Sequence, residues 1–208
     1  MSDLRPETPK EAWNALVDGN TRFVSGAPAH PRQGIDRRES VAELQRPFAA
    51  LFGCADSRLS AEIIFDVGLG DLFVVRNAGQ VIAETILGSL EYAVEVLKVP
   101  LILVLGHDEC GAIRATMNSQ EGNLQSEGEF IHNIVARIAP TVTRSYAAGK
   151  KDIDDITALH IKDTIDDIMS RSTLIAKAVK EGKLGVVGAN YKLALGEIRT
   201  LVTHGDIA

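Results

Sequence analysis

The fold is decided by the stretch Leu101-Ile102-Leu103-Val104-Leu105-Gly106-His107-Asp108-Glu109-Cys110-Gly111, in which an apolar run leads directly into polar residues. A continuous apolar run without alternation is typical of a parallel strand buried on both faces. Three further short runs of this kind occur at Phe48 to Phe52, Leu72 to Val75 and Leu184 to Val187. The segments between them have helical spacing, so the sequence predicts an α/β fold.

We expect these four strands to form a parallel sheet core in the order 2-1-3-4, flanked by helices, with a possible short antiparallel edge strand. This order places the first and third strands side by side, at the crevice where the winding of the sheet reverses. A chain of 208 residues can bury one sizeable core, and we expect residues 1–208 to form a single domain.

Residues 1–34 are predicted to form an N-terminal helical arm. Thr8-Pro9-Lys10-Glu11 has the form of a capping box with proline at the first helical position, and Pro28-Ala29-His30-Pro31 ends the helix. An apolar stripe follows the cap at Trp13, Leu16, Val17, Asn20 and Phe23. We expect this stripe to lie on another subunit rather than on its own core, which predicts a homodimer or a dimer of dimers.

Composition excludes several classes of protein. The chain has 22 Lys and Arg against 28 Asp and Glu, and its longest basic run is Arg37-Arg38, which disfavours nucleic-acid binding. No stretch approaches the ~20 apolar residues of a membrane span, and the N-terminus lacks the apolar segment of a signal peptide. Two cysteines exclude a disulfide scaffold, so we expect a cytoplasmic protein that binds neither nucleic acid nor membranes.

Candidate metal ligands follow two of the predicted strands. The first strand ends in Cys54-Ala55-Asp56-Ser57-Arg58, and the third is followed by His107 and Cys110. If the two strands are neighbours, two thiolates, an imidazole and a carboxylate converge at one edge of the sheet. Zinc accepts sulfur, nitrogen and oxygen ligands. We therefore predict one Zn²⁺ per chain held by Cys54, His107 and Cys110, with the fourth position either open to water or closed by Asp56.

Other interpretations of the cysteines are weaker. Both could be small buried apolar residues, but each lies at a strand end beside polar residues. A structural zinc site usually contains C-x-x-C pairs, whereas these cysteines are far apart in the sequence and neither has a nearby cysteine. A redox dithiol is disfavoured for the same reason.

These motifs make the sequence resemble a β-class carbonic anhydrase. Cys54-Ala55-Asp56-Ser57-Arg58 is similar to the family's C-x-D-S-R motif, and His107 to Gly111 is similar to its H-x-x-C-G motif. Phe73 to Gly79 and Gly188 to Tyr191 resemble two of its strands. The resemblance implies a zinc-dependent carbonate dehydratase that hydrates carbon dioxide to bicarbonate and a proton by attack of zinc-bound hydroxide. It also implies an obligate dimer whose N-terminal helices embrace the partner.

The resemblance also implies roles for individual residues. Asp56 and Arg58 would form a dyad that orients the hydroxide. If Arg58 moved away, Asp56 could bind zinc directly and give an inactive form at lower pH. Without the motif, the two residues would be interpreted as an ordinary ion pair in a loop. Substrate-binding positions of the family are matched by residues that would otherwise be assigned to the surface, the core or a helix start: Gln45, Phe73, Ala78, Tyr92 and Gly111.

Three points stay open at this level. A bicarbonate-inhibited subclass carries Trp where this chain has Leu51, so we do not expect that effector site. No motif identifies a proton-shuttle histidine. Two competing functions are a related hydrolase of carbonyl sulfide or carbon disulfide, and a zinc protein permanently closed by Asp56 with a structural or bicarbonate-sensing role.

Overall fold

Five strands form one sheet in the order β2-β1-β3-β4-β5, in a computed structural model that describes residues 5–124 and 126–207. The strands are β1 (Ala49–Cys54), β2 (Leu72–Asn77), β3 (Leu101–His107), β4 (Gly185–Tyr191) and β5 (Ile198–His204). The first four pair in parallel, whereas β5 runs antiparallel to β4. The predicted order 2-1-3-4 and the predicted antiparallel edge strand are therefore confirmed.

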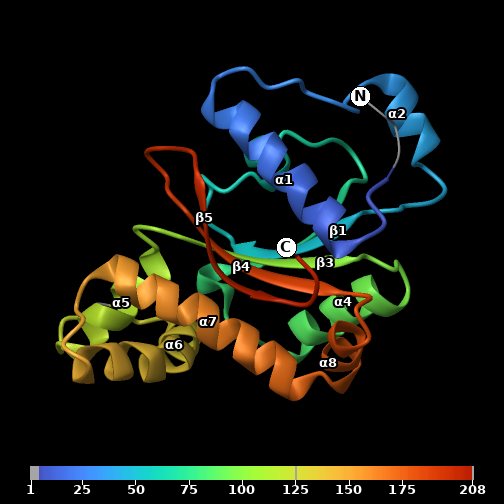
Figure 1. Cartoon of the computed structure of the whole chain (residues 1–208). Helices are drawn as coiled ribbons and strands as arrows, with labels where there is room; N and C mark the ends of the chain where they lie inside the picture. Colours follow the sequence, from blue (N-terminus) through green and yellow to red (C-terminus); the bar gives the residue numbers. More distant parts are fainter. Residues whose placement is uncertain (1–4, 125, 208) are drawn as a thin grey trace.

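Helices cover both faces of this sheet. They are α1 (Pro9–Val24), α2 (Ile35–Ser40), α3 (Ala61–Ile64), the 3₁₀ turn η1 (Ala78–Gln80), α4 (Glu84–Glu95), α5 (Gly111–Gln120), α6 (Glu129–Ala147), α7 (Ile153–Arg171) and α8 (Thr173–Lys180). In Figure 1, α1 and α2 lie on one side of the sheet and α4 to α8 on the other. Coverage on both faces explains why every residue of β1, β3 and β4 is buried. Among the described residues, no helix is both long and apolar enough to cross a membrane.

Helix α1 begins at the predicted capping box. Thr8 Oγ1 accepts a hydrogen bond from the Glu11 backbone N–H at 3.2 Å, and Glu11 Oε2 accepts one from the Thr8 N–H at 3.2 Å. The apolar stripe that follows is buried within this chain, with Ala12 and Leu16 fully enclosed and Trp13 nearly so. The stripe therefore packs on its own core, contrary to our expectation.

Contact of the arm with a partner subunit stays a prediction, and residues 1–4 of the arm lie outside the described residues.

Asn20 fixes the buried face of α1 in place. Its amide donates to the carbonyls of Ile64 (3.1 Å) and Gly196 (2.8 Å). Its oxygen accepts the N–H of Ile198 at 3.1 Å, where β5 begins. One side chain thus joins α1 to the end of α3 and to the start of β5.

The parallel register aligns the carboxyl ends of the strands. Cys54 lies opposite Asn77 of β2, and the neighbouring residue Gly53 lies opposite Leu105 of β3. His107, two residues further along β3, lies opposite Tyr191 of β4. The residues that end β1, β2 and β3 are consequently gathered at one edge of the sheet, where polar side chains can meet.

Candidate metal centre

Three side chains converge at this edge. The ligand atoms of Cys54, His107 and Cys110 all lie within 4.8 Å of one another, and all three residues are buried. Cys54 ends β1, His107 ends β3, and Cys110 is the residue that precedes α5. The strand register and the start of one helix thus bring together the three residues predicted as zinc ligands.

The orientation of His107 favours a metal. Its Nδ1 lies 2.7 Å from the backbone oxygen of Asp108. Because a carbonyl oxygen only accepts, Nδ1 carries the proton and Nε2 is left with a free lone pair. Nε2 is buried and has no hydrogen-bond partner in the described part of the chain. An unpartnered buried nitrogen costs about 1–3 kcal/mol, and a metal ion would relieve that cost.

The two thiols favour a cation for a second reason. A hydrogen bond from Cys110, opposed by burial and helped by the Gly79 backbone N–H, lowers the pKa of Cys54 to about 4. The same bond raises the pKa of Cys110, since losing its proton would place two thiolates side by side. The pair holds one proton between them, and a bound cation would allow both to ionise. Two sulfurs and one imidazole nitrogen are a donor set that zinc accepts.

Asp56 lies beside this cluster and is held by Arg58. Arg58 Nε donates to Asp56 Oδ1 at 2.9 Å and Nη2 donates to Oδ2 at 2.7 Å, a bidentate pair. This pair, opposed by burial, holds the pKa of Asp56 well below its usual value, and in turn raises that of Arg58. Asp56 Oδ2 is 3.9 Å from His107 Nε2, so the carboxylate lies at the cluster but outside the three-residue group. Its predicted role as a fourth ligand stays a prediction.

The predicted substrate residues divide into two groups. Ala78 and Gly111 lie next to the cluster, because Ala78 follows the partner of Cys54 in β2 and Gly111 follows Cys110. Gln45 is exposed in the loop before β1, at the opposite end of the strand from Cys54. Phe73 and Tyr92 pair with each other, with ring centroids 6.0 Å apart, and Phe73 lies four register positions before Asn77. The structure therefore does not bring these last three residues to the cluster of their own chain.

Sequence analysis did not predict the contacts by which two residues hold the Cys54 loop. Arg76, from β2, donates to the backbone oxygens of Cys54 (2.8 Å) and Asp56 (2.6 Å). The backbone N–H of Gly79 donates to Cys54 Sγ at 3.3 Å. Both residues belong to the stretch that resembles a strand of the family, and this resemblance was the only sign in the sequence that they matter. Their contacts could not be predicted, because contacts that involve backbone atoms cannot be inferred from residue type.

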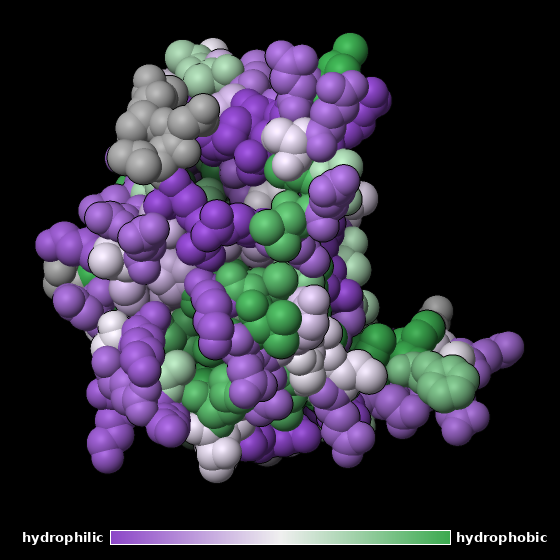
Figure 2. Space-filling model, turned by 90° about the vertical axis from the view of Figure 1, so that its right-hand side faces the viewer, coloured by the Kyte–Doolittle hydropathy of each residue, from purple (hydrophilic) through white to green (hydrophobic). Residues whose placement is uncertain are grey.

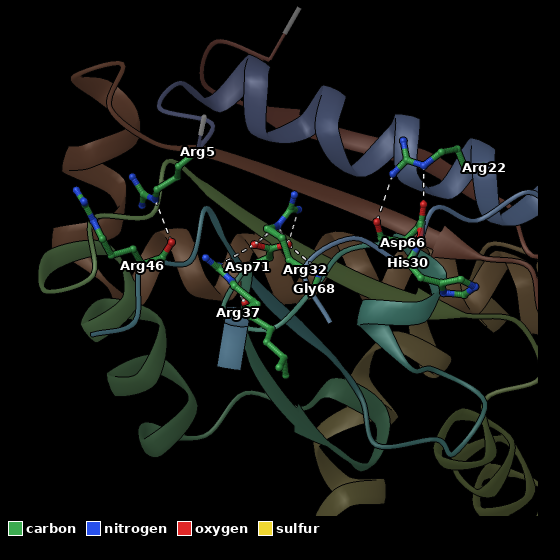
Figure 3. Close-up of polar contacts among 10 residues, drawn as sticks. Arg5, Arg22, His30, Arg32, Arg37, Arg46, Asp66, Gly68 and Asp71 are labelled. Atoms are coloured by element: carbon green, nitrogen blue, oxygen red, sulfur yellow. Dashed lines mark hydrogen bonds and ion pairs between the residues drawn. The ribbon is translucent and has the colours of Figure 1, made fainter. Parts of the chain in front are cut away.

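A large cavity lies away from the cluster. It measures about 1050 Å³ and lies between α1, α2 and the residues before β1 and β2, such as Phe48 and Asp71. Figure 3 shows its main ion pairs, in which Arg22 reaches Asp66 while Arg32 and Arg37 reach Asp71. Figure 2 views the molecule from the right-hand side of Figure 1. The upper part of that surface is mostly hydrophilic, whereas apolar side chains gather lower down. A cavity lined by paired charges does not suit an apolar gas, so size alone does not locate the site.

Comparisons with known proteins agree with the cluster. The sequence model of the family described as "Carbonic anhydrase" matches residues 49–198. A protein named "Carbonic anhydrase" from Mycolicibacterium smegmatis is 50% identical over 200 residues, covering 96% of each chain. "Carbonic anhydrase 2" from Mycobacterium tuberculosis is 48% identical over 186 residues, covering 89% of each chain.

Solved structures give the same result. The β-carbonic anhydrase of Coccomyxa, in complex with acetazolamide, matches with a TM-score of 0.70 at 25% identity, covering 91% of this chain and 86% of that one. A structure titled as one of two tetrameric β-carbonic anhydrases from Sordaria macrospora shares the fold, with a TM-score of 0.72 at 22% identity, covering 92% and 98%. With its ligand cluster, its sheet order and relatives along nearly its whole length, the chain belongs to the β-class carbonic anhydrases.

Proposed function

We propose that this chain carries out the reversible hydration of carbon dioxide at the cluster of Cys54, His107 and Cys110, with one zinc ion per chain. The reaction follows from membership of the family, and the assignment of residues is our proposal. The observation that carries it is the unpartnered Nε2 of His107, buried within 4.8 Å of two cysteine sulfurs. When bound there, zinc lowers the pKa of a coordinated water to about 7 and so supplies a nucleophile at neutral pH.

Asp56 is the residue that orients the attacking water. Its carboxylate stays ionised because Arg58 pairs with both oxygens, and the Arg58 backbone N–H donates to Oδ1 at 2.9 Å. An ionised carboxylate accepts a hydrogen bond from the water molecule, and this bond fixes the direction in which the lone pair of the water oxygen points. Asp56 Oδ2 is 3.9 Å from His107 Nε2, close enough for the carboxylate to contact a molecule bound at the cluster.

The contact between Asp56 and Arg58 also bears on the closed alternative. To become a fourth ligand, Asp56 would have to turn towards the metal, which would disturb its bidentate pair with Arg58. Since both oxygens are engaged by the guanidinium, we propose that the open arrangement is the resting one and that release of Arg58 would close the site. Arg58 is half exposed, so solvent can accept the guanidinium when the pair breaks.

Gln45, Phe73 and Tyr92 have a role only between subunits. We propose that they line the site of a partner in a homodimer or a dimer of dimers, because each is remote from the cluster of its own chain. Gln45 is exposed and Tyr92 is 44% exposed, so both are available to a second copy. The Sordaria relative described as tetrameric supports assembly of this kind. The two free cysteines, which must stay reduced to bind zinc, support a cytoplasmic location.

The test is stopped-flow hydration of carbon dioxide from pH 6 to 9, on protein whose zinc content has been measured. We expect activity in proportion to zinc, its loss on chelation and its return when zinc is restored. Zinc-loaded protein that is inactive throughout this range would contradict the proposal. Parallel assays with carbonyl sulfide and carbon disulfide address the competing hydrolase, which would turn over these substrates faster than carbon dioxide.

A further inference from the structure

His160 belongs to none of the motifs described above, but it is buried and is connected to the cluster by hydrogen bonds through Gly79. It lies on α7, is 5% exposed, and its Nε2 is 2.8 Å from the backbone oxygen of Gly79. A carbonyl oxygen cannot donate, so Nε2 carries the proton and His160 is the donor. Burial lowers the pKa of His160, and its neutral form is sufficient for this bond.

Gly79 continues the connection to the metal ligands. Its own N–H donates to Cys54 Sγ at 3.3 Å. The carbonyl that His160 holds and the N–H that meets the sulfur therefore belong to the same residue. Two hydrogen bonds thus run in sequence from the imidazole on α7, through one glycine, to the thiolate that ends β1.

Gly79 cannot fix this geometry alone. Its φ of +72° is a conformation that glycine adopts freely, and a glycine can rotate its two flanking peptides at low cost. Asn77 holds the two ends of the turn, since its side chain accepts from Val81 N at 2.9 Å and donates to Val81 O at 2.8 Å. His160 holds the middle of the turn, where the N–H to sulfur originates.

The turn is also confined from the side of α5. A Cβ on Gly79 would lie 2.7 Å from the Cβ of Ala112 and 3.0 Å from Ile138 Cδ1. Ala112 follows Cys110 by two residues, so the same glycine packs against the helix that carries the second sulfur ligand. A rotation at Gly79 would therefore disturb both its hydrogen bond to Cys54 and its packing beside Ala112.

We propose that His160 is a positioning residue for the zinc ligand Cys54, acting through the Gly79 peptide. Hydrogen bonds to a ligating sulfur reduce the electron density that it gives to the metal, and so leave the metal a stronger Lewis acid. The inference rests on the proposed function, because it requires Cys54 to be a ligand.

The test compares His160→Gln with His160→Asn. The Gln side chain places its Nε2 where the imidazole Nε2 was, whereas the Asn amide is one carbon shorter and cannot reach Gly79. Both variants put an uncharged amide into the same buried space, so a purely structural role would affect them alike. The readouts are zinc affinity from chelator competition, the energy of the thiolate-to-cobalt band in the cobalt-substituted protein, and the midpoint of the pH–rate profile.

We expect His160→Gln to behave as the unsubstituted chain. His160→Asn should bind zinc about 10-fold more weakly, because the turn that positions Cys54 is no longer held in place. Its thiolate-to-cobalt band should move to lower energy and its pH–rate midpoint to higher pH, because the sulfur donates more strongly. Ile165→Ala, in the same helix, is the control for lost stability: it should lower the urea midpoint and leave the band in place.

The proposal would be overturned by a band and midpoint unchanged in both His160 variants, or by equal shifts in both. A shift of the band in Ile165→Ala as large as that in His160→Asn would also overturn it. Absence of thiolate-to-cobalt bands in the unsubstituted protein would be a different failure, because it would remove Cys54 from the ligand set and the proposed function with it.

Discussion

The two ends of the sheet both bury ionisable side chains, but only one end leaves them without partners. At the amino end, Asp71 directly precedes β2, receives the N–H of Gly68 and the guanidinium groups of Arg32 and Arg37, and has a buried side chain. At the carboxyl end, the Nε2 of His107 is also buried and has no partner among the described residues.

This difference distinguishes buried groups that stabilise the fold from buried groups that bind a ligand. A buried charge whose partners are complete holds the chain together, as Asp66 and Asp71 hold the segment between α1 and β2. A buried lone pair without a partner costs free energy that the fold must recover elsewhere, and it persists where a ligand will fill the gap. The comparison predicts that substitutions at the carboxyl end remove activity, whereas those at the amino end remove stability.

Substitution of a ligand should give the largest effect. Cys54→Ser is expected to lose both zinc and carbon dioxide hydration, since one of three protein ligands becomes a poor donor. Metal analysis and stopped-flow hydration on the same preparation measure this. A variant that retained full zinc and full rate would remove Cys54 from the centre.

Asp56→Asn should give a smaller loss. The amide cannot act as an ionised acceptor, so we expect kcat/KM to fall by about 100-fold while zinc content is unchanged. Ser57→Ala, next in the chain, is the matched control and should keep zinc. If Asp56→Asn hydrated carbon dioxide at the normal rate, the orienting role would be wrong.

At the amino end, Asp71→Asn should reduce stability rather than activity. Asp71 is 7% exposed and pairs with Arg32 and Arg37, which are each about one-third exposed. Loss of its charge is expected to lower the free energy of unfolding by about 2–4 kcal/mol, the lower figure reflecting solvent around the arginines. Urea unfolding measures the change. A comparable loss of zinc-normalised activity in the folded variant would break the division between the two ends.

Asp66→Asn is expected to have the smallest effect, and its effect on the free energy of unfolding should depend on pH. Burial opposes its ionisation, but the N–H of Ala29 and the Arg22 guanidinium outweigh burial, so the pKa of Asp66 lies below its usual value. Its stabilisation is therefore present above the unfolded pKa of about 3.9 and is lost as pH falls through the lower folded pKa. Relative to Asp66→Asn, the native chain should be more stable by about 2 kcal/mol at pH 7, and this difference should shrink below pH 4.

Urea unfolding of both proteins at pH 7, 5, 4 and 3 tests this sign. A difference that grew on acidification would mean that Asp66 is protonated in the folded state at neutral pH.

The fold was largely predictable because β1, β3 and β4 are buried on both faces and so appear as unbroken apolar runs. Strand β5 was anticipated only as an edge, since Arg199, Thr200 and Thr203 interrupt its apolar residues and it is largely exposed. The apolar stripe of α1 was also recognised, but a stripe does not specify whether it packs on its own core or on a partner subunit. Its destination depends on contacts such as that of Asn20 with Ile64 and Gly196, which join residues far apart in the sequence.

The three ligand candidates at the site were predictable from strand ends and residue type. Gly79 and His160 were not, because Gly79 acts through its own backbone N–H and His160 through the backbone oxygen of Gly79. Gln45, Phe73 and Tyr92 could be matched to positions of the family, but a single chain cannot say in which subunit a side chain is used.

The two cysteines have a practical consequence. Because Cys54 and Cys110 are the only thiols in the sequence and both are buried, a metal-loaded chain offers no reactive sulfur to solvent. A cysteine introduced on the surface would therefore be the sole site of labelling by maleimide reagents. Spin labels or fluorophores can be placed one at a time without altering the native residues, and distances between labelled copies can then reveal how the chains assemble.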